Sequence, residues 1–116
     1  MLQGGVAEAA VALWQRAFPE LEARAPTDTD PTWALRLGDQ EVTLFDSPMP
    51  HDFGPTPAWS FMVDCAEAED VDRRLALLSE GGKVMMPADS YDFAARFAWV
   101  EDRFGISWQL RHGGRA

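Results

Sequence analysis

With 116 residues, of which 47% are hydrophobic, the chain is long enough to bury the core of one folded domain, which excludes a wholly disordered protein. Its 10 Lys and Arg against 19 Asp and Glu give a formal net charge of -9, which disfavours nucleic acid and anionic membrane surfaces as partners. The lone Cys65 cannot form an internal disulfide, and no stretch approaches the roughly 20 apolar residues of a membrane-spanning helix. Because the N-terminus also lacks a basic segment followed by an apolar run, we expect a cytoplasmic protein.

The first half of the chain predicts a helix, a weak strand and a hairpin. An apolar stripe at helical spacing predicts a helix over residues 5–17, which Pro19 helps to end. Residues 20–30 carry little periodicity and are typical of a weak strand followed by a polar turn. Two hairpin strands joined by a short turn then complete this half, at 32–37 and 41–46.

The second half repeats this order of elements after a linker. Four prolines and Gly54 fall between residues 47 and 57 and disfavour regular structure there. A strand and a helix follow, and Gly81 with Gly82 supplies the left-handed residue that ends the helix. The predicted segments are a strand at 58–64, a helix at 67–79, a strand at 83–86, a loop at 87–91 and a closing hairpin at 96–100 and 106–110.

Because helix, weak strand and hairpin occur twice, we predict an α+β fold made of two half-modules. Each half is too small to bury its own sheet, so we expect both to share one open cup. The expected boundaries are a single domain 1–116, with half-modules at 1–50 and 58–112, a linker at 51–57 and a tail at 113–116. The repeat is one of pattern and not of identical residues, so two unrelated α+β halves remain the alternative.

Three segments are similar to a known family: 5–19 to its first helix with the Phe18-Pro19 exit, 59–82 to its second strand-helix unit, and 98–110 to its closing hairpin. On these residues the chain resembles the PhnB-like branch of the vicinal oxygen chelate superfamily, which includes proteins labelled as 3-demethylubiquinone-9 3-methyltransferase-like. The resemblance covers nearly the whole chain. It implies paired β-α-β-β-β modules that form a cup-shaped mixed sheet, the glyoxalase/bleomycin-resistance fold.

The start of the chain departs from the family pattern. The family normally opens with an apolar strand, whereas only Met1-Leu2-Gln3 precede Gly4 here. The resemblance therefore implies a truncated first strand, either because the sequence starts late or because another subunit covers the missing edge. Both explanations favour a homodimer.

Metal-using members of the superfamily place His, Gln or Glu ligands on equivalent strands inside the cup. By resemblance, Ala58 stands at one ligand position, Leu44 or Phe45 at a second and Gln109 at a third, while the fourth falls in the truncated stretch. Only Gln109 has a donor atom, and its amide is neutral. We therefore expect no preformed metal site and no cofactor.

Period-two alternation, with Gln109 pointing inward as the resemblance implies, indicates which side chains line the cup. The candidate ligand-binding residues are Trp99, Gln109, Phe97, Ser107, Ser60, Met62 and Arg36. The same alternation turns four others toward the helices: Trp59, Phe61, Ile106 and Trp108. A mixed aromatic and polar lining is typical of a small-molecule site. The alternatives are a filled cup, with Trp99 as a core residue, and a solvated Arg36.

The remaining polar residues favour structural roles. His51 and Asp52 are adjacent in the linker, which favours a surface loop over a catalytic base and its orienting carboxylate. His112 falls in a Gly-rich end that we expect to be solvated or disordered. Cys65 ends a strand with no basic residue expected nearby, which predicts an inert thiol. Residues 89–92 predict an ordinary turn, with a lid at the cup mouth as the alternative.

Two classes of function and one simpler alternative follow. The first is a module that binds or sequesters a small organic molecule, stacked on Trp99 and Phe97 and hydrogen-bonded by Gln109 and Ser107. The second is a metal-dependent lyase, isomerase or dioxygenase that recruits a metal through Gln109, and the third is a dimeric interaction unit with a closed cup. The missing ligand set favours the first. The methyltransferase label is not adopted, because we find no Gly-rich strand-to-helix turn such as nucleotide-type cofactors use.

Overall fold

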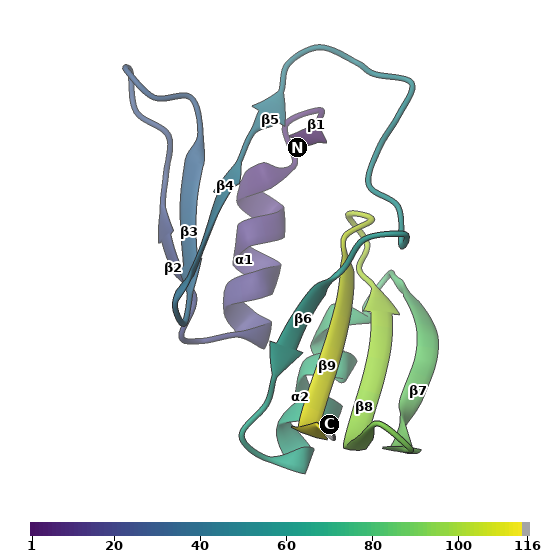
Figure 1. Ribbon diagram of the computed structural model, residues 1–116. Helices are drawn as coiled ribbons and strands as arrows, with labels where there is room; N and C mark the ends of the chain where they lie inside the picture. The colour runs from purple at the N-terminus through teal and green to yellow at the C-terminus, as the bar shows by residue number, and fades with distance from the viewer. Residues whose placement is uncertain (115–116) are drawn as a thin grey trace. The chain divides into compact units, whose positions relative to one another are not determined.

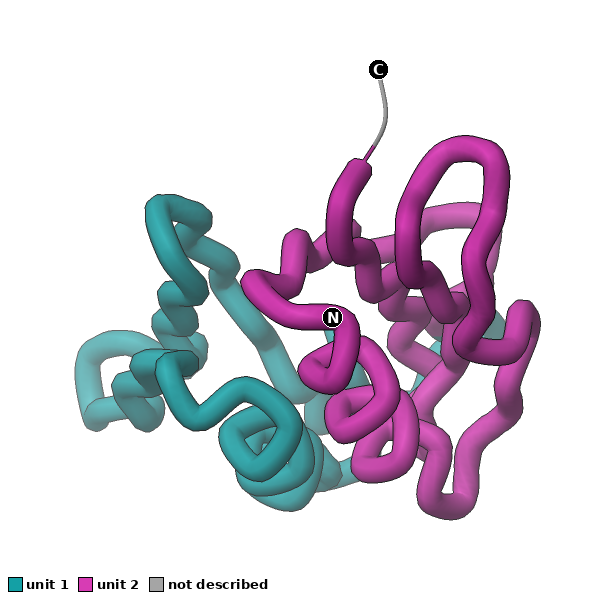
Figure 2. The backbone as a smooth tube through the Cα atoms, turned by 90° about the horizontal axis from the view of Figure 1, so that it is seen from below, with its two compact units in different colours: residues 1–54 teal, residues 55–116 magenta. Residues whose placement is uncertain are grey.

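The computed structural model describes residues 1–114, which form two compact units (Figure 2). Unit 1 is Met1–Gly54 and unit 2 begins at Pro55. The division falls inside the proline-rich segment that the sequence predicted as a linker. Residues 115–116, the last two of the predicted tail, lie outside the described residues.

Unit 1 carries one helix and two small sheets (Figure 1). Its elements are β1 (Leu2–Gln3), α1 (Ala7–Ala17), β2 (Glu22–Arg24), β3 (Trp33–Leu37), β4 (Gln40–Leu44) and β5 (Asp46–Ser47). The antiparallel sheet has the order β2-β3-β4, and β5 continues from the end of β4 to pair in parallel with β1. The opening strand expected to be truncated is thus present as two residues, and Leu2 is buried.

Unit 2 has the same order of elements around a single sheet (Figure 1). Its elements are β6 (Phe61–Asp64), α2 (Ala68–Leu78), β7 (Lys83–Tyr91), β8 (Ala94–Glu101) and β9 (Ser107–Gly114). The strand order is β6-β9-β8-β7, with β6 parallel to β9 as β1 is to β5. Each unit is therefore a β-α-β-β-β module, which confirms the predicted fold class.

Helix α2 begins and ends where its local sequence predicts. A capping box joins the Glu67 side chain to the backbone N–H of Asp70 and the Asp70 side chain to that of Glu67. At the other end Gly81 adopts a φ of +69°, a conformation that side chains other than glycine rarely take. A Cβ at Gly82 would collide with the carbonyl oxygen of Glu101, so the helix end also needs glycine to approach the sheet.

One face of the unit 2 sheet packs against α2 and forms the core of the unit. The register pairs Ala98 with Leu110 and Val100 with Trp108, and all four are buried. Val71 and Leu78 on α2 are fully buried as well. Burial of an aliphatic side chain of this size stabilises the fold by roughly 1.5–3 kcal/mol, so this face holds the sheet in place.

Four local expectations for unit 2 are wrong. Residues 87–91 extend β7 and do not form a loop; Pro87 is tolerated because β7 lies at the edge of the sheet, where register shifts interrupt its pairing. His112 lies within β9, which continues to Gly114. Trp59 precedes β6 and is 62% exposed, so it does not pack under a helix. Ile106 lies in the turn before β9 and is only half-buried.

Among residues 1–114, neither helix is long and apolar enough to cross a membrane.

Candidate functional site

The face of the unit 2 sheet opposite α2 collects most of the residues predicted to bind a ligand. Trp99 on β8 lies opposite Gln109 on β9, and Gln109 lies opposite Met62 on β6. Ser60 and Ser107 lie at one end of the same face, where their hydroxyl oxygens are 2.5 Å apart. We call Ser60, Met62, Trp99, Ser107 and Gln109 the Trp99 face.

A hydrogen-bond chain holds the Trp99 indole. Its Nε1 donates to Ser107 Oγ at 2.7 Å, and Ser107 Oγ in turn contacts Ser60 Oγ. Ser107 is only 2% exposed, so its hydroxyl makes its hydrogen bonds inside the protein. A serine hydroxyl can donate once and accept twice, which is enough for both partners. The indole plane is therefore oriented before any ligand arrives.

Gln109 and Met62 supply the rest of the accessible surface. Gln109 is half-buried and its amide can both donate and accept hydrogen bonds. Met62 is 47% exposed, and its flexible thioether can adapt to an apolar group. Met86 on β7 lies opposite Trp99 on the other side and was not among the predicted residues. With Met86 beside it, the Trp99 face combines an aromatic plane, an amide and two thioethers.

Phe97 lies on the same face, but other aromatic rings cover its ring. It is 3% exposed and meets the rings of Phe93 and Tyr91 edge to face, with centroids 4.8 and 5.7 Å away. Sequence reasoning missed this aromatic group because it read residues 87–91 as a loop. The two apolar rings that flank Asp92 were a signal that the closing hairpin began earlier.

Arg36 is the one candidate that lies in unit 1. It is on β3, and its Nη2 lies 2.6 Å from Glu22 Oε2 on β2, with both side chains more than half exposed. The guanidinium therefore already has a carboxylate partner within its own unit. Its role in the wall of a cup stays a prediction.

An ion pair closes the other end of the Trp99 face. Arg111 donates through Nε and Nη2 to the two carboxylate oxygens of Asp64, at 2.7 and 3.2 Å. These hydrogen bonds lower the pKa of Asp64 and raise that of Arg111. Both groups stay charged at neutral pH, so a ligand on the face meets a paired and not a free charge here.

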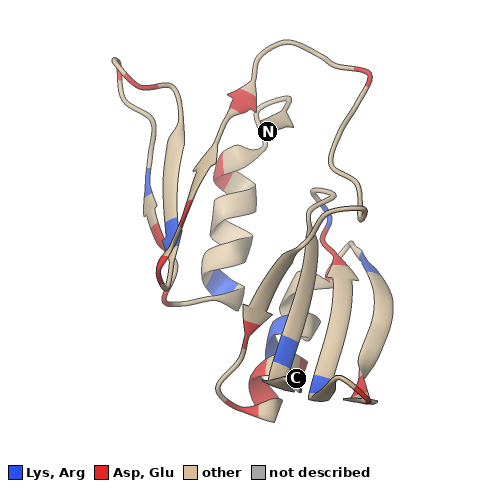
Figure 3. Cartoon of the chain, viewed as in Figure 1, with Lys and Arg blue, Asp and Glu red and all other residues tan. Residues whose placement is uncertain are grey.

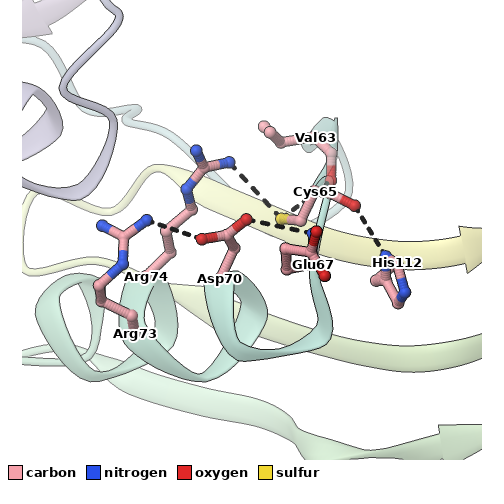
Figure 4. Close-up of polar contacts among 7 residues, drawn as sticks. All are labelled: Val63, Cys65, Glu67, Asp70, Arg73, Arg74 and His112. Carbon is pink, nitrogen blue, oxygen red and sulfur yellow. Dashed lines mark hydrogen bonds and ion pairs between the residues drawn. The ribbon is translucent and has the colours of Figure 1, made fainter.

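Cys65 is surrounded by polar groups (Figure 4). Arg74 Nη1 lies 3.5 Å from its sulfur, so the expectation that no basic residue lies nearby is wrong. Burial nevertheless outweighs the guanidinium and raises the pKa of the thiol. His112 bonds through Nδ1 to the Cys65 carbonyl oxygen at 3.0 Å and helps to join β9 to the start of α2. A thiol with a raised pKa is a poor nucleophile, and the cluster has a structural role.

The positions implied as metal ligands do not fit a divalent cation. Ala58 lies in the turn before β6 and the buried Leu44 ends β4, and neither side chain has a donor atom. Gln109 offers one neutral oxygen. Within the described part of the chain no group of three His, Cys, Asp or Glu side chains could hold a metal ion. The polar groups of the Trp99 face are the Gln109 amide and the hydroxyls of Ser60 and Ser107.

Known proteins are similar to this chain in sequence and fold. A family model described as 3-demethylubiquinone-9 3-methyltransferase matches residues 5–111. The chain is similar to the solved structure of a putative 3-demethylubiquinone-9 3-methyltransferase, PhnB protein, from Bacillus cereus, with 31% identity and a TM-score of 0.84 over 97% of this chain and 95% of that chain. No curated protein matches the chain.

Two more distant structures show the fold alone. A lactoylglutathione lyase from Agrobacterium tumefaciens has 18% identity and a TM-score of 0.64 over 97% of this chain and 89% of that chain. A genomically encoded fosfomycin resistance protein from Listeria monocytogenes has 12% identity and a TM-score of 0.69 over 97% and 86%. The chain belongs to the PhnB-like 3-demethylubiquinone-9 3-methyltransferase family and has the glyoxalase/bleomycin-resistance fold of the vicinal oxygen chelate superfamily.

Proposed function

We propose that this protein binds a small organic molecule with a flat, unsaturated part on the Trp99 face, and that it does so without a preformed metal site. The observation that supports this most is the Trp99 indole, which the Ser107 hydroxyl holds by a hydrogen bond of 2.7 Å. A ring that is already oriented loses little conformational freedom on binding, so more of the stacking energy appears as affinity. Gln109 then fixes the ligand through a hydrogen bond.

The alternative is a metal-dependent lyase, isomerase or dioxygenase, a class suggested by the name of the Agrobacterium tumefaciens lyase. It would have to recruit its metal through Gln109 and groups of the substrate. The donor set argues against it, because carboxylate or imidazole ligands are what hold a divalent cation in proteins.

The family name refers to methyl transfer, a reaction that needs a cofactor-binding site. The turn between β1 and α1 is the place to look for one. Contrary to the sequence reading, a strand-to-helix turn between β1 and α1 does contain Gly4 and Gly5. The backbone N–H groups of Gly5 and Ala7, however, already donate to the Asp46 carboxylate at 3.0 and 2.8 Å. The turn therefore does not offer these amides to a nucleotide-type cofactor.

We further propose that the protein is a cytoplasmic homodimer. Strands β6 and β7 are the two edges of the unit 2 sheet, and a strand edge with unpaired backbone groups favours pairing with a second copy. Light scattering on the purified protein tests the dimer, and a monomer at micromolar concentration contradicts it. Cell fractionation tests the location, and recovery of the protein with the membrane or extracellular fraction contradicts it.

A thermal-shift screen of small aromatic and carbonyl compounds, followed by calorimetry on the hits, tests the binding site. We expect Trp99→Leu and Gln109→Leu to weaken binding by at least about tenfold, since each removes a main contact. Trp59→Leu is the matched control, because it removes an exposed tryptophan that lies in contact with Phe61 outside the Trp99 face. No shift with any compound contradicts the proposal and favours an interaction module, and stoichiometric Ni, Zn, Fe or Mn in the purified protein contradicts its metal-free part.

A further inference from the structure

Unit 1 contains a hollow that is separate from the Trp99 face. Its volume is about 610 Å³, which is in the range of small-molecule sites. It lies beside the start of α1, and its lining includes Gly5, Ala7, Glu8, Trp33 and residues 46–48 of the β5 segment. Sequence reasoning did not find it, because these residues come from three distant segments.

Rigid groups form much of the wall. Trp33 and Leu35 are two positions apart on β3, so Trp33 lies on the same side of the strand as the buried Leu35. Pro26 and Pro31 bound a loop that is closed by a pair of backbone hydrogen bonds between Thr27 and Asp30, at 2.8 and 3.3 Å. Because proline fixes φ and the loop is bonded internally, this part of the wall has little conformational freedom.

The charge of the hollow is negative. Its ten lining residues include two carboxylates, Glu8 and Asp46, and no Lys, Arg or His. Figure 3 shows acidic residues both in the first turn of α1 and on β5. The helix N-terminus offsets only about half a unit charge, so more than one negative charge remains.

Neighbouring cations do not cancel that charge. Arg24, next to the lining residue Ala25, forms an ion pair with Asp30 at 3.6 Å. His51 contacts the hydroxyl of Ser47 through Nε2 at 2.9 Å and is not among the lining residues. The field at the hollow therefore favours a cation.

We propose that this hollow binds a monovalent organic cation, an ammonium group carrying apolar substituents. Two carboxylates attract the charge, and the aromatic Trp33 with its proline neighbours accommodates the substituents, as in cation–π recognition of alkylammonium groups. A metal ion fits less well, because no group of three His, Cys, Asp or Glu side chains in residues 1–114 could hold one. An anion would meet the two carboxylates.

Nuclear magnetic resonance of the ¹⁵N-labelled full chain tests this proposal with choline as the probe. We expect saturable shifts of the Gly5, Ala7 and Glu8 amides and of the Trp33 indole, with a Kd of about 1–10 mM. The uncharged isostere 3,3-dimethyl-1-butanol should bind at least about tenfold more weakly, because it has the same shape without the charge. Equal affinity for the two compounds, or no saturable shift at about 50 mM choline, overturns the proposal.

Two variants assign the contacts. Glu8→Gln should weaken choline binding about threefold to fivefold, while Glu69→Gln is the matched control because both are exposed acidic residues in the first turn of a helix. Trp33→Leu should weaken binding at least about threefold by removing the aromatic ring. Equal loss in Glu8→Gln and Glu69→Gln contradicts the site. Trp99→Leu should leave choline binding unchanged, so this proposal stands or fails separately from the one for the Trp99 face.

Discussion

Asp102 organises the turn that aligns β8 with β9, and its removal should be costly. This residue is 3% exposed, and its carboxylate accepts hydrogen bonds from the backbone N–H groups of Phe104 and Ile106 at 2.9 and 3.1 Å and from Trp108 Nε1 at 2.9 Å. The same alignment places Trp99 opposite Gln109. The turn therefore supports both the core and the candidate site.

The expected cost of Asp102→Ala follows from these bonds. A buried donor left unsatisfied costs about 1–3 kcal/mol, and Trp108 is such a donor because it is itself buried. The two backbone bonds contribute about 0.5–1.5 kcal/mol each. We expect the free energy of unfolding to fall by about 2–6 kcal/mol, a large fraction of the stability of a domain of this size.

Urea unfolding followed by tryptophan fluorescence measures this loss. Asp102→Asn should lose less, because its amide keeps one acceptor oxygen. Asp89→Ala is the matched control, since Asp89 is exposed and its carboxylate accepts a hydrogen bond from the neighbouring Ser90 amide. A loss below about 1 kcal/mol in Asp102→Ala, or a loss equal to that of Asp89→Ala, refutes the role assigned to this turn.

Three further predictions concern other contacts. Ser107→Ala should lower the free energy of unfolding by about 1–2 kcal/mol and weaken binding at the Trp99 face, and unchanged values in calorimetry count against the hydrogen-bond chain. Cys65 should react with a thiol reagent at least about 100-fold more slowly in the native protein than in urea, because burial raises its pKa; equal rates contradict its burial. Since the Arg111 hydrogen bond lowers the pKa of Asp64, the pair stabilises the fold above about pH 4, and this contribution is lost as the pH falls through the lowered value. Asp64→Asn should therefore differ from the wild type in urea unfolding at about pH 7 and converge with it at about pH 2, and a constant difference contradicts the ion pair.

Local sequence patterns were sufficient for the order of elements and for much of the Trp99 face. Helix α2 could be predicted because its acidic start and its glycine end are read from neighbouring residues. Trp99, Gln109 and Met62 could be placed on one face because side chains alternate along every strand and the family resemblance implies that Gln109 points inward. The ligand role of these residues stays a prediction.

Contacts between distant segments could not be predicted in the same way. Pairing of β1 with β5 joins residues more than 40 positions apart, and the hydrogen bonds from Gly5 and Ala7 to Asp46 follow from it. No periodicity in the sequence indicates that Arg74 approaches the Cys65 sulfur. Nor does one indicate that the rings of Tyr91 and Phe93 pack against Phe97.

The sequence by itself determined the repeated order of helix, weak strand and hairpin, because hydrophobic periodicity, capping residues and glycine positions act over a few neighbouring residues. Only the tertiary structure decided that Ser107 is buried and holds the indole of Trp99, and that a negatively charged hollow lies at the start of α1. The physical reason is that a hydrogen-bond partner or a cavity wall is chosen by position in space. Residues 5, 33 and 46 become neighbours only once the strands have paired.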